Sequence, residues 1–279
     1  MKSSQKTRLL VIGGAIIIFV LLFFVNKKPD VVSTAKPSVA ANSDSSAISF
    51  DQFIEKQKAS VGNENATSLR LEALFGHADQ NQKINFSDSL INCWDSLKKP
   101  AVAAFYAEKK AGFSNAAKDW YRAGDRYYKS AGFVDPSYRP MLFDKAMDCL
   151  NKCLVIEPGN LEAQVDLGVC YVESSTNPMK GISLLKGVLE KDSNNVDAQL
   201  NLGFFSVKSG QYDKALYRFQ RVLQIDPTYL EAYLFLEDVY EKMGNKTEAI
   251  VCLKKYVSLV DDPTIRSEVK SYINKLENS

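Results

Sequence analysis

Residues 196–229 decide the fold, and they read VDAQLNLGFFSVKSGQYDKALYRFQRVLQIDPTY. Leu, Phe and Tyr recur along this stretch at the i, i+3, i+4 spacing of helices that bury one face. The small residues Gly203 and Ala215 let two antiparallel helices approach closely, and Pro227 ends the second apolar run. The stretch therefore predicts a hairpin of two packed helices.

The same hairpin pattern recurs along the chain. The pair Leu167-Gly168 returns 35 residues later as Leu202-Gly203 and, after a further 34 residues, as Leu236-Glu237. Two more sets recur every 34 residues, one of small and one of large side chains: Gly181, Ala215 and Ala249, and Leu185, Phe219 and Leu253. A fixed period of this length predicts stacked hairpins, each of which buries one face against the next.

This spacing resembles the tetratricopeptide repeat, whose pattern is W-x2-L-G-x2-Y, then A-x3-F, then P, over about 34 residues. Residues 196–229 depart from the pattern at Gln199 and Ser206, where Trp and Tyr are usual. The residues that match it are Leu202, Gly203, Ala215, Phe219 and Pro227. The other copies span 117–160, with an insertion around Val134 to Phe143, 161–195, with one extra residue, and 230–263, where Glu237 replaces Gly.

The resemblance implies an all-α fold. We expect a right-handed superhelix, or α-solenoid, of about four helix hairpins over residues 117–263, with residues 264–279 as a capping helix over the last exposed apolar face. Residues 50–116 are expected to form a helical N-terminal region. Whether the stretch from Ser87 to Ala111 is a degenerate further repeat stays open from the sequence alone.

The N-terminus carries a candidate membrane segment. Residues 9–25 are seventeen consecutive apolar or glycine residues, with basic residues on both sides. At about 1.5 Å per residue the run is slightly shorter than a bilayer core, but flanking lysines reach the interface. We expect a single membrane helix, with residues 1–8 as a cytoplasmic stub, 26–49 as a flexible linker and the remainder on the extracytoplasmic, periplasmic side. A cleaved signal peptide is the alternative.

Charge and motif content exclude several classes of function. The chain carries 35 Lys and Arg against 33 Asp and Glu, which is too close to neutral for nucleic acid to be the main ligand. His77 is the sole imidazole and no catalytic or cofactor motif is found, so we expect no enzyme and no cofactor. The five cysteines form no CxxC pair, and Asp79-x-Asn81-x-Lys83 departs from a calcium loop, so no metal site is expected.

The resemblance also implies where a ligand binds, because the first helix of each tetratricopeptide hairpin lines a concave groove. The expected groove residues are Tyr121, Tyr128, Val165, Val169, Leu200, Phe204, Leu234 and Asp238. An apolar centre with a polar rim suits an amphipathic helix or an extended hydrophobic peptide of a partner protein. The alternative is that neighbouring helices or residues 50–114 fill this apolar strip.

These features together predict a membrane-anchored scaffold for protein–protein interaction. Its layout resembles anchored repeat proteins of bacterial envelopes, including assembly factors, and secondarily mitochondrial outer-membrane receptors. Two alternatives belong to other classes. The repeats would self-associate into a homo-oligomer within a membrane complex, or residues 50–114 would hold an enzyme site that the repeats assist.

Overall fold

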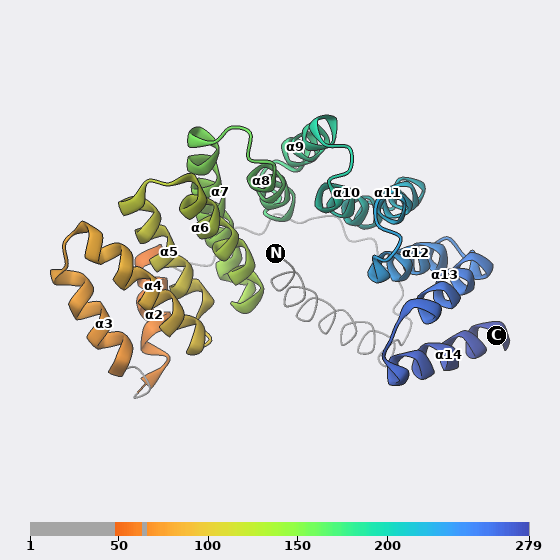
Figure 1. Ribbon diagram of the computed structural model, residues 1–279, viewed down its shortest axis with the longest axis horizontal. Coiled ribbons are helices and arrows are strands. Elements are labelled where there is room, and N and C mark those ends of the chain that lie inside the picture. Colours follow the sequence, from red (N-terminus) through yellow and green to blue (C-terminus); the bar gives the residue numbers. More distant parts are fainter. Residues whose placement is uncertain (1–47, 63–65, 279) are drawn as a thin grey trace, which may run out of the picture. The chain divides into compact units, whose positions relative to one another are not determined.

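The computed structural model describes residues 48–62 and 66–278, which contain thirteen α-helices and no strand (Figure 1). The expected stub at 1–8, the expected membrane helix at 9–25 and all but the last two residues of the expected linker at 26–49 lie outside the described residues. Within the described residues, no helix combines the length and apolarity that crossing a bilayer requires.

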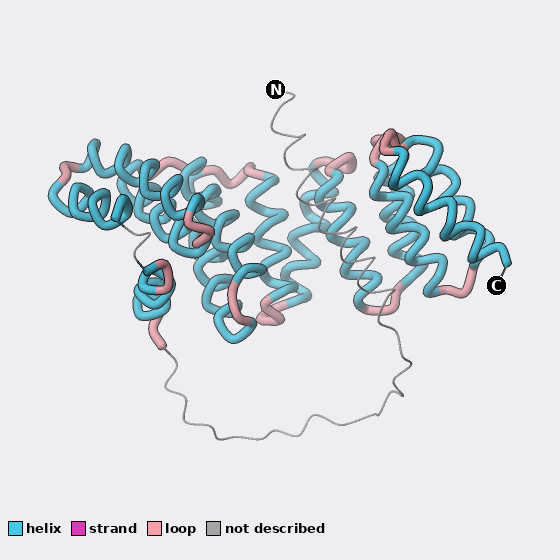
Figure 2. Tube along the Cα trace, turned by 90° about the horizontal axis from the view of Figure 1, so that it is seen from below, coloured by secondary structure: helices cyan, strands magenta, loops and turns pink. Residues whose placement is uncertain are grey.

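Four helix hairpins follow one another from Ala117 to Leu259. They are α6 (Ala117–Ser130) with α7 (Arg139–Ile156), α8 (Leu161–Glu173) with α9 (Pro178–Lys191), α10 (Val196–Lys208) with α11 (Tyr212–Ile225), and α12 (Leu230–Lys242) with α13 (Lys246–Leu259). Each hairpin packs on the next in chain order, and α14 (Pro263–Asn278) packs on α13 (Figure 2). The predicted all-α stack of hairpins is confirmed.

The stack continues on the N-terminal side of these four hairpins. The helices there are α2 (Phe50–Ala59), α3 (Ala66–His77), α4 (Gln80–Ser96) and α5 (Pro100–Ser114). Helices α4 and α5 pack together, α3 packs on α4, and α5 packs on α6. Residues 80–114 therefore add a further helix pair to the row.

Helix α2 is held by aromatic contacts from distant segments. The ring of Phe50 lies 5.8 Å from that of Tyr127 on α6, and the ring of Phe53 lies 4.9 Å from that of Tyr138. Tyr138 belongs to the insertion in the first repeat, which folds as two 3-10 turns, Ala131–Phe133 and Pro136–Tyr138, before α7 begins. The insertion thus supplies a packing partner for α2.

Asparagine caps set the starts of four repeat helices. The side chains of Asn160, Asn177, Asn195 and Asn245 each accept a hydrogen bond from the backbone N–H three residues on, over 2.9 to 3.3 Å. Such a bond satisfies one of the N–H groups that a helix start leaves without an intrahelical partner. The boundaries between helices are therefore encoded locally.

Glycines allow the closest contacts within the hairpins. A Cβ atom built on Gly181 of α9 would lie 2.3 Å from the backbone oxygen of Gly168 on α8, and one on Gly203 of α10 would lie 2.4 Å from the buried ring of Phe219 on α11. These distances leave no room for a methyl group. The recurrence of small residues at these positions is therefore a packing requirement of the hairpin.

We expect Gly181→Ala to destabilise the fold, because the added methyl group meets the backbone oxygen of Gly168 on α8, which cannot move aside, in addition to the side chain of Val172. The free energy of unfolding should fall by about 2 to 4 kcal/mol, measured by urea unfolding of the full chain. Gly187→Ala on the same helix is the matched control, since nothing lies within 4 Å of its added Cβ. The free energy of unfolding of Gly187→Ala should rise by up to about 1 kcal/mol. Equal decreases in the unfolding free energy of both variants would contradict the packing account.

Candidate protein-binding surface

The two helices of each hairpin take different sides of the stack. In Figure 1, α8, α10 and α12 lie on the inner side of the row of helices, and α9, α11 and α13 lie on the outer side. We call the side formed by α6, α8, α10 and α12 the inner face. All eight expected groove residues lie on these four helices.

Neighbouring helices cover the centre of the expected apolar strip. Val165 and Val169 are each 3% exposed and pack with Leu185 and Leu202, and Leu200 is 7% exposed and packs with Ala232 and Leu236. The alternative that adjacent helices fill the strip therefore applies to these three side chains. They stabilise the stack and do not present an open surface to a partner.

Phe204 is the apolar groove residue that remains open. It is 39% exposed although its ring lies 5.4 Å from that of Phe219 and 4.7 Å from that of Phe235. The cluster joins α10, α11 and α12, so it holds the exposed edge of Phe204 in place. A fixed, partly exposed aromatic ring is a suitable anchor point for a partner side chain.

The remaining groove residues lie at the two ends of the inner face. Tyr121 and Tyr128 are half-buried on α6, and Tyr128 packs against the core of both the first and the second hairpin. Leu234 is half-buried and packs in the cluster that α13 and α14 form. Asp238 is exposed and forms an ion pair with Lys242 one turn along α12. The structure thus does not bring the eight residues together into one continuous strip.

Carboxylates from three successive inner helices repel one another where the strip was expected to be apolar. Asp166 of α8 is half-buried and feels the charges of Asp125 on α6 and Asp197 on α10, and one of its oxygens is buried with no hydrogen-bond partner among the described residues. Burial, together with repulsion from Asp125 and Asp197, raises the pKa of Asp166 to about 7, although Lys129 and a hydrogen bond from Tyr121 oppose the shift. The cluster therefore carries an incompletely neutralised negative charge.

Charge is distributed unevenly between the two sides of the second, third and fourth hairpins. The inner helices α8, α10 and α12 carry eight acidic side chains against Lys208 and Lys242. These acids are Glu162, Asp166, Glu173, Asp197, Glu231, Glu237, Asp238 and Glu241. The outer helices α9, α11 and α13 carry nine basic side chains against Glu190, Asp213 and Glu248. In these three hairpins the inner helices are thus acidic and the outer helices are basic, even though the chain as a whole is nearly neutral.

Glu237 occupies a position where the preceding hairpins have glycine. It is 8% exposed, and one of its carboxylate oxygens is buried without a hydrogen-bond partner among the described residues. Burial and the neighbouring carboxylates of Glu241 and Asp238 raise its pKa to about 8, and Lys242 offsets part of this shift. Tyr272 of the capping helix donates to Glu241 over 2.6 Å, which connects this acidic end of the inner face to α14.

We expect Glu237→Gln to stabilise the fold increasingly as the pH rises. The unfolded carboxyl loses its proton near its ordinary pKa of about 4.3, whereas the folded one keeps its proton up to about 8, so the wild type loses stability between those values. The difference in unfolding free energy should grow to about 2 to 4 kcal/mol and level off above pH 8. Glu190→Gln, an exposed carboxyl on α9 far from this cluster in sequence, is the control, and a difference that does not vary with pH would contradict the burial account.

Side chains with redox or metal-binding chemistry do not gather on this surface. All five cysteines are free thiols, and burial raises the pKa of Cys149 to about 12, so this thiol stays protonated at neutral pH. His77 is exposed at the end of α3, away from the inner face. Among the described residues, no group of three or more His, Cys, Asp or Glu side chains is arranged to hold a metal ion.

The acidic cluster could have been found by counting charges helix by helix. The overall balance of charge hides it, because acids and bases segregate to alternate helices rather than to separate segments of the chain. Asp166 gives no signal by itself, since a single Asp on an amphipathic helix is ordinarily solvent-exposed. Its burial follows from stacking against α6 and α10, which the sequence of α8 does not specify.

Comparison with known proteins agrees with this geometry. Residues 206–267 match the family model described as tetratricopeptide repeat. This match covers α11, α12 and α13 in full. A solved tetratricopeptide repeat protein from Parabacteroides merdae has this fold, with a TM-score of 0.56, 17% identity, and coverage of 82% of this chain and 86% of that chain.

Two further similarities are more limited in extent. The mitochondrial import receptor subunit TOM70 of Rattus norvegicus is 25% identical over 125 residues, which cover 44% of this chain and 20% of that protein. The chain thus matches about a fifth of that relative's length. YrrB, described as a tetratricopeptide repeat protein with an unusual peptide-binding site, is 23% identical, with a TM-score of 0.45 over 72% of this chain and 96% of that chain.

Proposed function

We propose that the chain is a membrane-anchored interaction scaffold whose inner face binds a basic segment of a partner protein. Residues 9–25 would hold it in the membrane, with the repeats on the extracytoplasmic side, in the manner of an envelope assembly factor. Tetratricopeptide repeats act as protein-interaction scaffolds, and this chain stacks four helix hairpins in a row, of which residues 206–267 match the family model. The proposal assigns no reaction and no cofactor to the repeats.

One observation carries the choice of a basic partner, namely the segregation of acidic side chains to the inner helices. The eight acids of α8, α10 and α12 outnumber the two lysines on the same helices, and Lys242 is already paired with Asp238. A ligand rich in Lys and Arg meets complementary charge along this surface, which speeds association and fixes its register. A cation placed beside Asp125 or Asp197 would also offset the repulsion that Asp166 experiences.

Phe204 offers an apolar contact to a partner segment, in addition to the charge interactions with the acidic side chains. Its exposed ring lies on α10, between the acids of α8 and those of α12. A partner segment that combines basic side chains with an occasional large apolar one would therefore match the inner face. The similarity to the import receptor subunit of Rattus norvegicus over 125 residues supports a protein-binding role for this chain.

We expect a synthetic peptide of about twelve residues, alternating Lys with Leu, to bind the full chain in detergent. The affinity, measured by fluorescence anisotropy, should rise about tenfold from pH 6 to pH 8, because Asp166 becomes ionised across this range. Asp166→Asn should remove the part of this pH dependence that Asp166 supplies, and Asp166→Asn with Glu237→Gln should remove most of it, because burial also raises the pKa of Glu237 to about 8. Phe204→Gln should weaken binding at both pH values, because the exposed ring is lost.

Phe133→Gln is the matched control, since Phe133 is 77% exposed and lies outside the repeat helices that form the inner face. Sedimentation of the same samples separates peptide binding from self-association, in which the basic outer side of one copy would bind the acidic inner face of another. Undiminished peptide binding by Phe204→Gln, together with an unchanged pH profile in Asp166→Asn, would rule out the inner face as the binding surface.

Membrane anchoring is tested separately from partner binding. Deletion of residues 1–28 should move the protein from the membrane pellet to the soluble fraction, because it removes the seventeen-residue apolar run. Carbonate washing of the full-length protein distinguishes an integral segment from a peripheral contact. If the shortened protein stays in the pellet, the repeats bind the membrane or a membrane complex, and residues 9–25 are not the anchor.

A further inference from the structure

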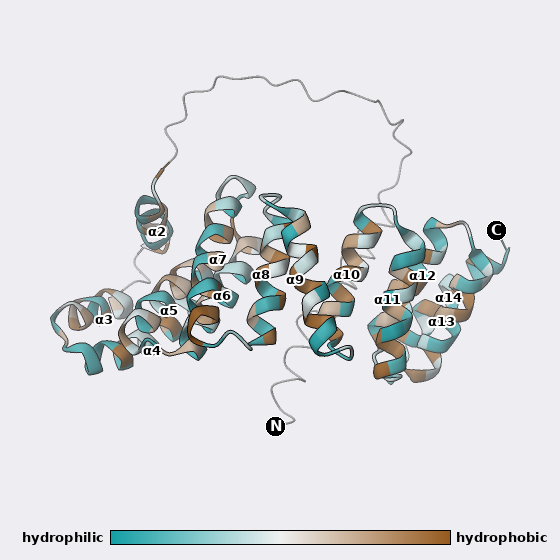
Figure 3. Ribbon diagram, turned by 90° about the horizontal axis from the view of Figure 1, so that it is seen from above, coloured by the Kyte–Doolittle hydropathy of each residue, from teal (hydrophilic) through white to brown (hydrophobic). Residues whose placement is uncertain are grey.

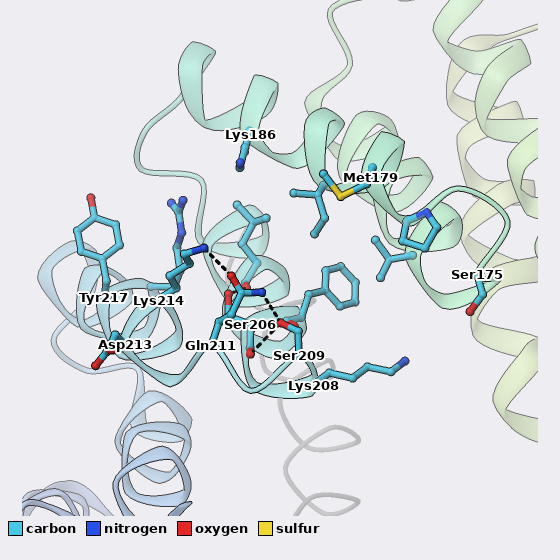
Figure 4. Close-up of a pocket in the computed structure, with 16 residues that line it drawn as sticks. Ser175, Met179, Lys186, Ser206, Lys208, Ser209, Gln211, Asp213, Lys214 and Tyr217 are labelled. Carbon is cyan, nitrogen blue, oxygen red and sulfur yellow. Dashed lines mark hydrogen bonds between the residues drawn. The ribbon is translucent and has the colours of Figure 1, made fainter. Parts of the chain in front are cut away.

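A groove of about 690 Å³ lies on the other side of the stack, at the junction of the second and third hairpins (Figure 4). Its walls come from α9 and α11, and its floor from the C-terminal ends of α8 and α10. The expected groove residues do not line it. It is therefore a surface separate from the inner face.

A missing aromatic ring helps to explain why the groove exists. The eleventh residue of the first helix is Tyr127 in the first hairpin, Tyr171 in the second and Tyr240 in the fourth, but it is Ser206 in the third. Tyr127 is fully buried and Tyr240 packs in the core of its hairpin, whereas Ser206 lines the groove. The serine hydroxyl donates back to the carbonyl of Leu202 over 2.7 Å and so stays against its own helix.

An enlarged turn contributes to the same opening. Residues 174–177 connect α8 to α9, one residue more than the turns 209–211 and 243–245 of the next two hairpins. The shorter turns use Gly210 and Gly244 at positive φ, whereas the longer one has Ser175 at φ 56°. Ser175 and Pro178 lie at the rim of the groove. The two departures from the repeat pattern, in the turn and at Ser206, thus coincide in space.

The groove has an apolar interior with exposed apolar edges. Four of the apolar side chains that line it come from three helices, and they are Val172, Ile182, Leu202 and Phe205. At the edges, Met179 on α9 is 71% exposed and Tyr217 on α11 is 61% exposed. Large apolar side chains left open on both walls of a groove indicate a surface that a partner covers, and methionine adapts readily to different partners.

Basic side chains surround this interior. The lining includes Lys186, Lys208, Lys214 and Arg218 against one acid, Asp213. Lys186 on α9 and Lys214 on α11 lie on different sides of the groove (Figure 4). Lys208, at the C-terminal end of α10, lies at another edge of the groove. Lys214 is held in place because it donates to Gln211, which in turn donates to Ser209. The cations are spread around the groove rather than gathered at one point.

We propose that this groove binds an acidic amphipathic helix of a partner protein. The apolar interior would receive the apolar face of such a helix, and the surrounding lysines would pair with carboxylates along its two flanks. A single anionic head group would need cations that converge, whereas these are distributed along two walls. The groove is independent of the inner face, so the chain would hold a basic segment on one side and an acidic helix on the other.

The test uses the full chain in a non-ionic detergent and a labelled peptide of about 18 residues, with Leu at helical i, i+3, i+4, i+7 spacing and Glu elsewhere. Fluorescence anisotropy should detect binding to the wild type. A peptide of the same composition with the Leu and Glu order scrambled should bind at least tenfold more weakly, because it presents no apolar face. Circular dichroism should show that helix content rises when the first peptide binds.

Two variants assign the binding to the groove. Ser206→Tyr refills it with the ring that the equivalent position has in the other hairpins, so the variant should fold and bind the peptide at least tenfold more weakly. Lys186→Glu with Lys214→Glu should have the same effect through charge. The matched controls are Ser183→Tyr, which adds the same ring on the exposed surface of α9, and Lys255→Glu on α13, and both should bind normally.

Several outcomes would overturn the proposal. If Ser206→Tyr binds the peptide as tightly as the wild type does, the groove is not the binding site. If the scrambled peptide binds as tightly as the amphipathic one, charge alone accounts for the binding. Displacement of the amphipathic peptide and of its scrambled version by short-chain phosphatidylglycerol would identify a lipid-binding surface instead. Lys186 and Lys214 lie on outer helices, and Ser206 lines this groove and is not one of the expected inner-face groove residues, so failure here would leave the binding of basic segments untouched.

Discussion

The close approach of the two helices within each hairpin is the constraint on which the rest of the molecule depends. Gly168 against Gly181, and Gly203 against Phe219, bring paired helices so near that an added methyl group has no space. Only then do Leu185 and Val188 of the second hairpin pack with Phe205 of the third and bury the apolar faces between them. The alternation of inner and outer helices, and with it the separation of acidic from basic surface, follows from this packing.

Departures from the repeat pattern mark the places where the surface acquires its chemistry. Glu237 replaces glycine and puts a carboxyl group into the packed interface of the fourth hairpin, beside Asp238 and Glu241. Hydrophilic and hydrophobic residues alternate along the helices of the stack (Figure 3). Ser206 replaces tyrosine and leaves a groove between the second and third hairpins. Both positions would be filled by ordinary packing residues in a regular repeat. The packing that is lost at Glu237 and at Ser206 is consistent with surfaces selected for binding rather than for stability alone.

The period and the small residues are local signals, which is why the sequence predicted an all-α stack of helix hairpins. Which side chains of the expected groove are open to a ligand was harder to predict. Val165, Val169 and Leu200 follow the spacing of a ligand-lining strip, but the same spacing serves to pack one hairpin on the next, and burial decides between the two roles. Asp166 was missed because its environment is assembled from α6, α8 and α10, three helices that no local pattern connects.

The central claim is that the acidic inner face, and not the outer side, receives a protein segment rich in basic residues. Site-specific photo-crosslinking in native membranes tests it most directly, with the photoreactive amino acid placed at Phe204 in one sample and at Val251, which is exposed on α13, in another. Mass spectrometry of the adducts should identify a Lys- and Arg-rich segment of a partner protein from Phe204 and not from Val251. Adducts from Val251 alone, or a segment without basic residues at Phe204, would contradict the account.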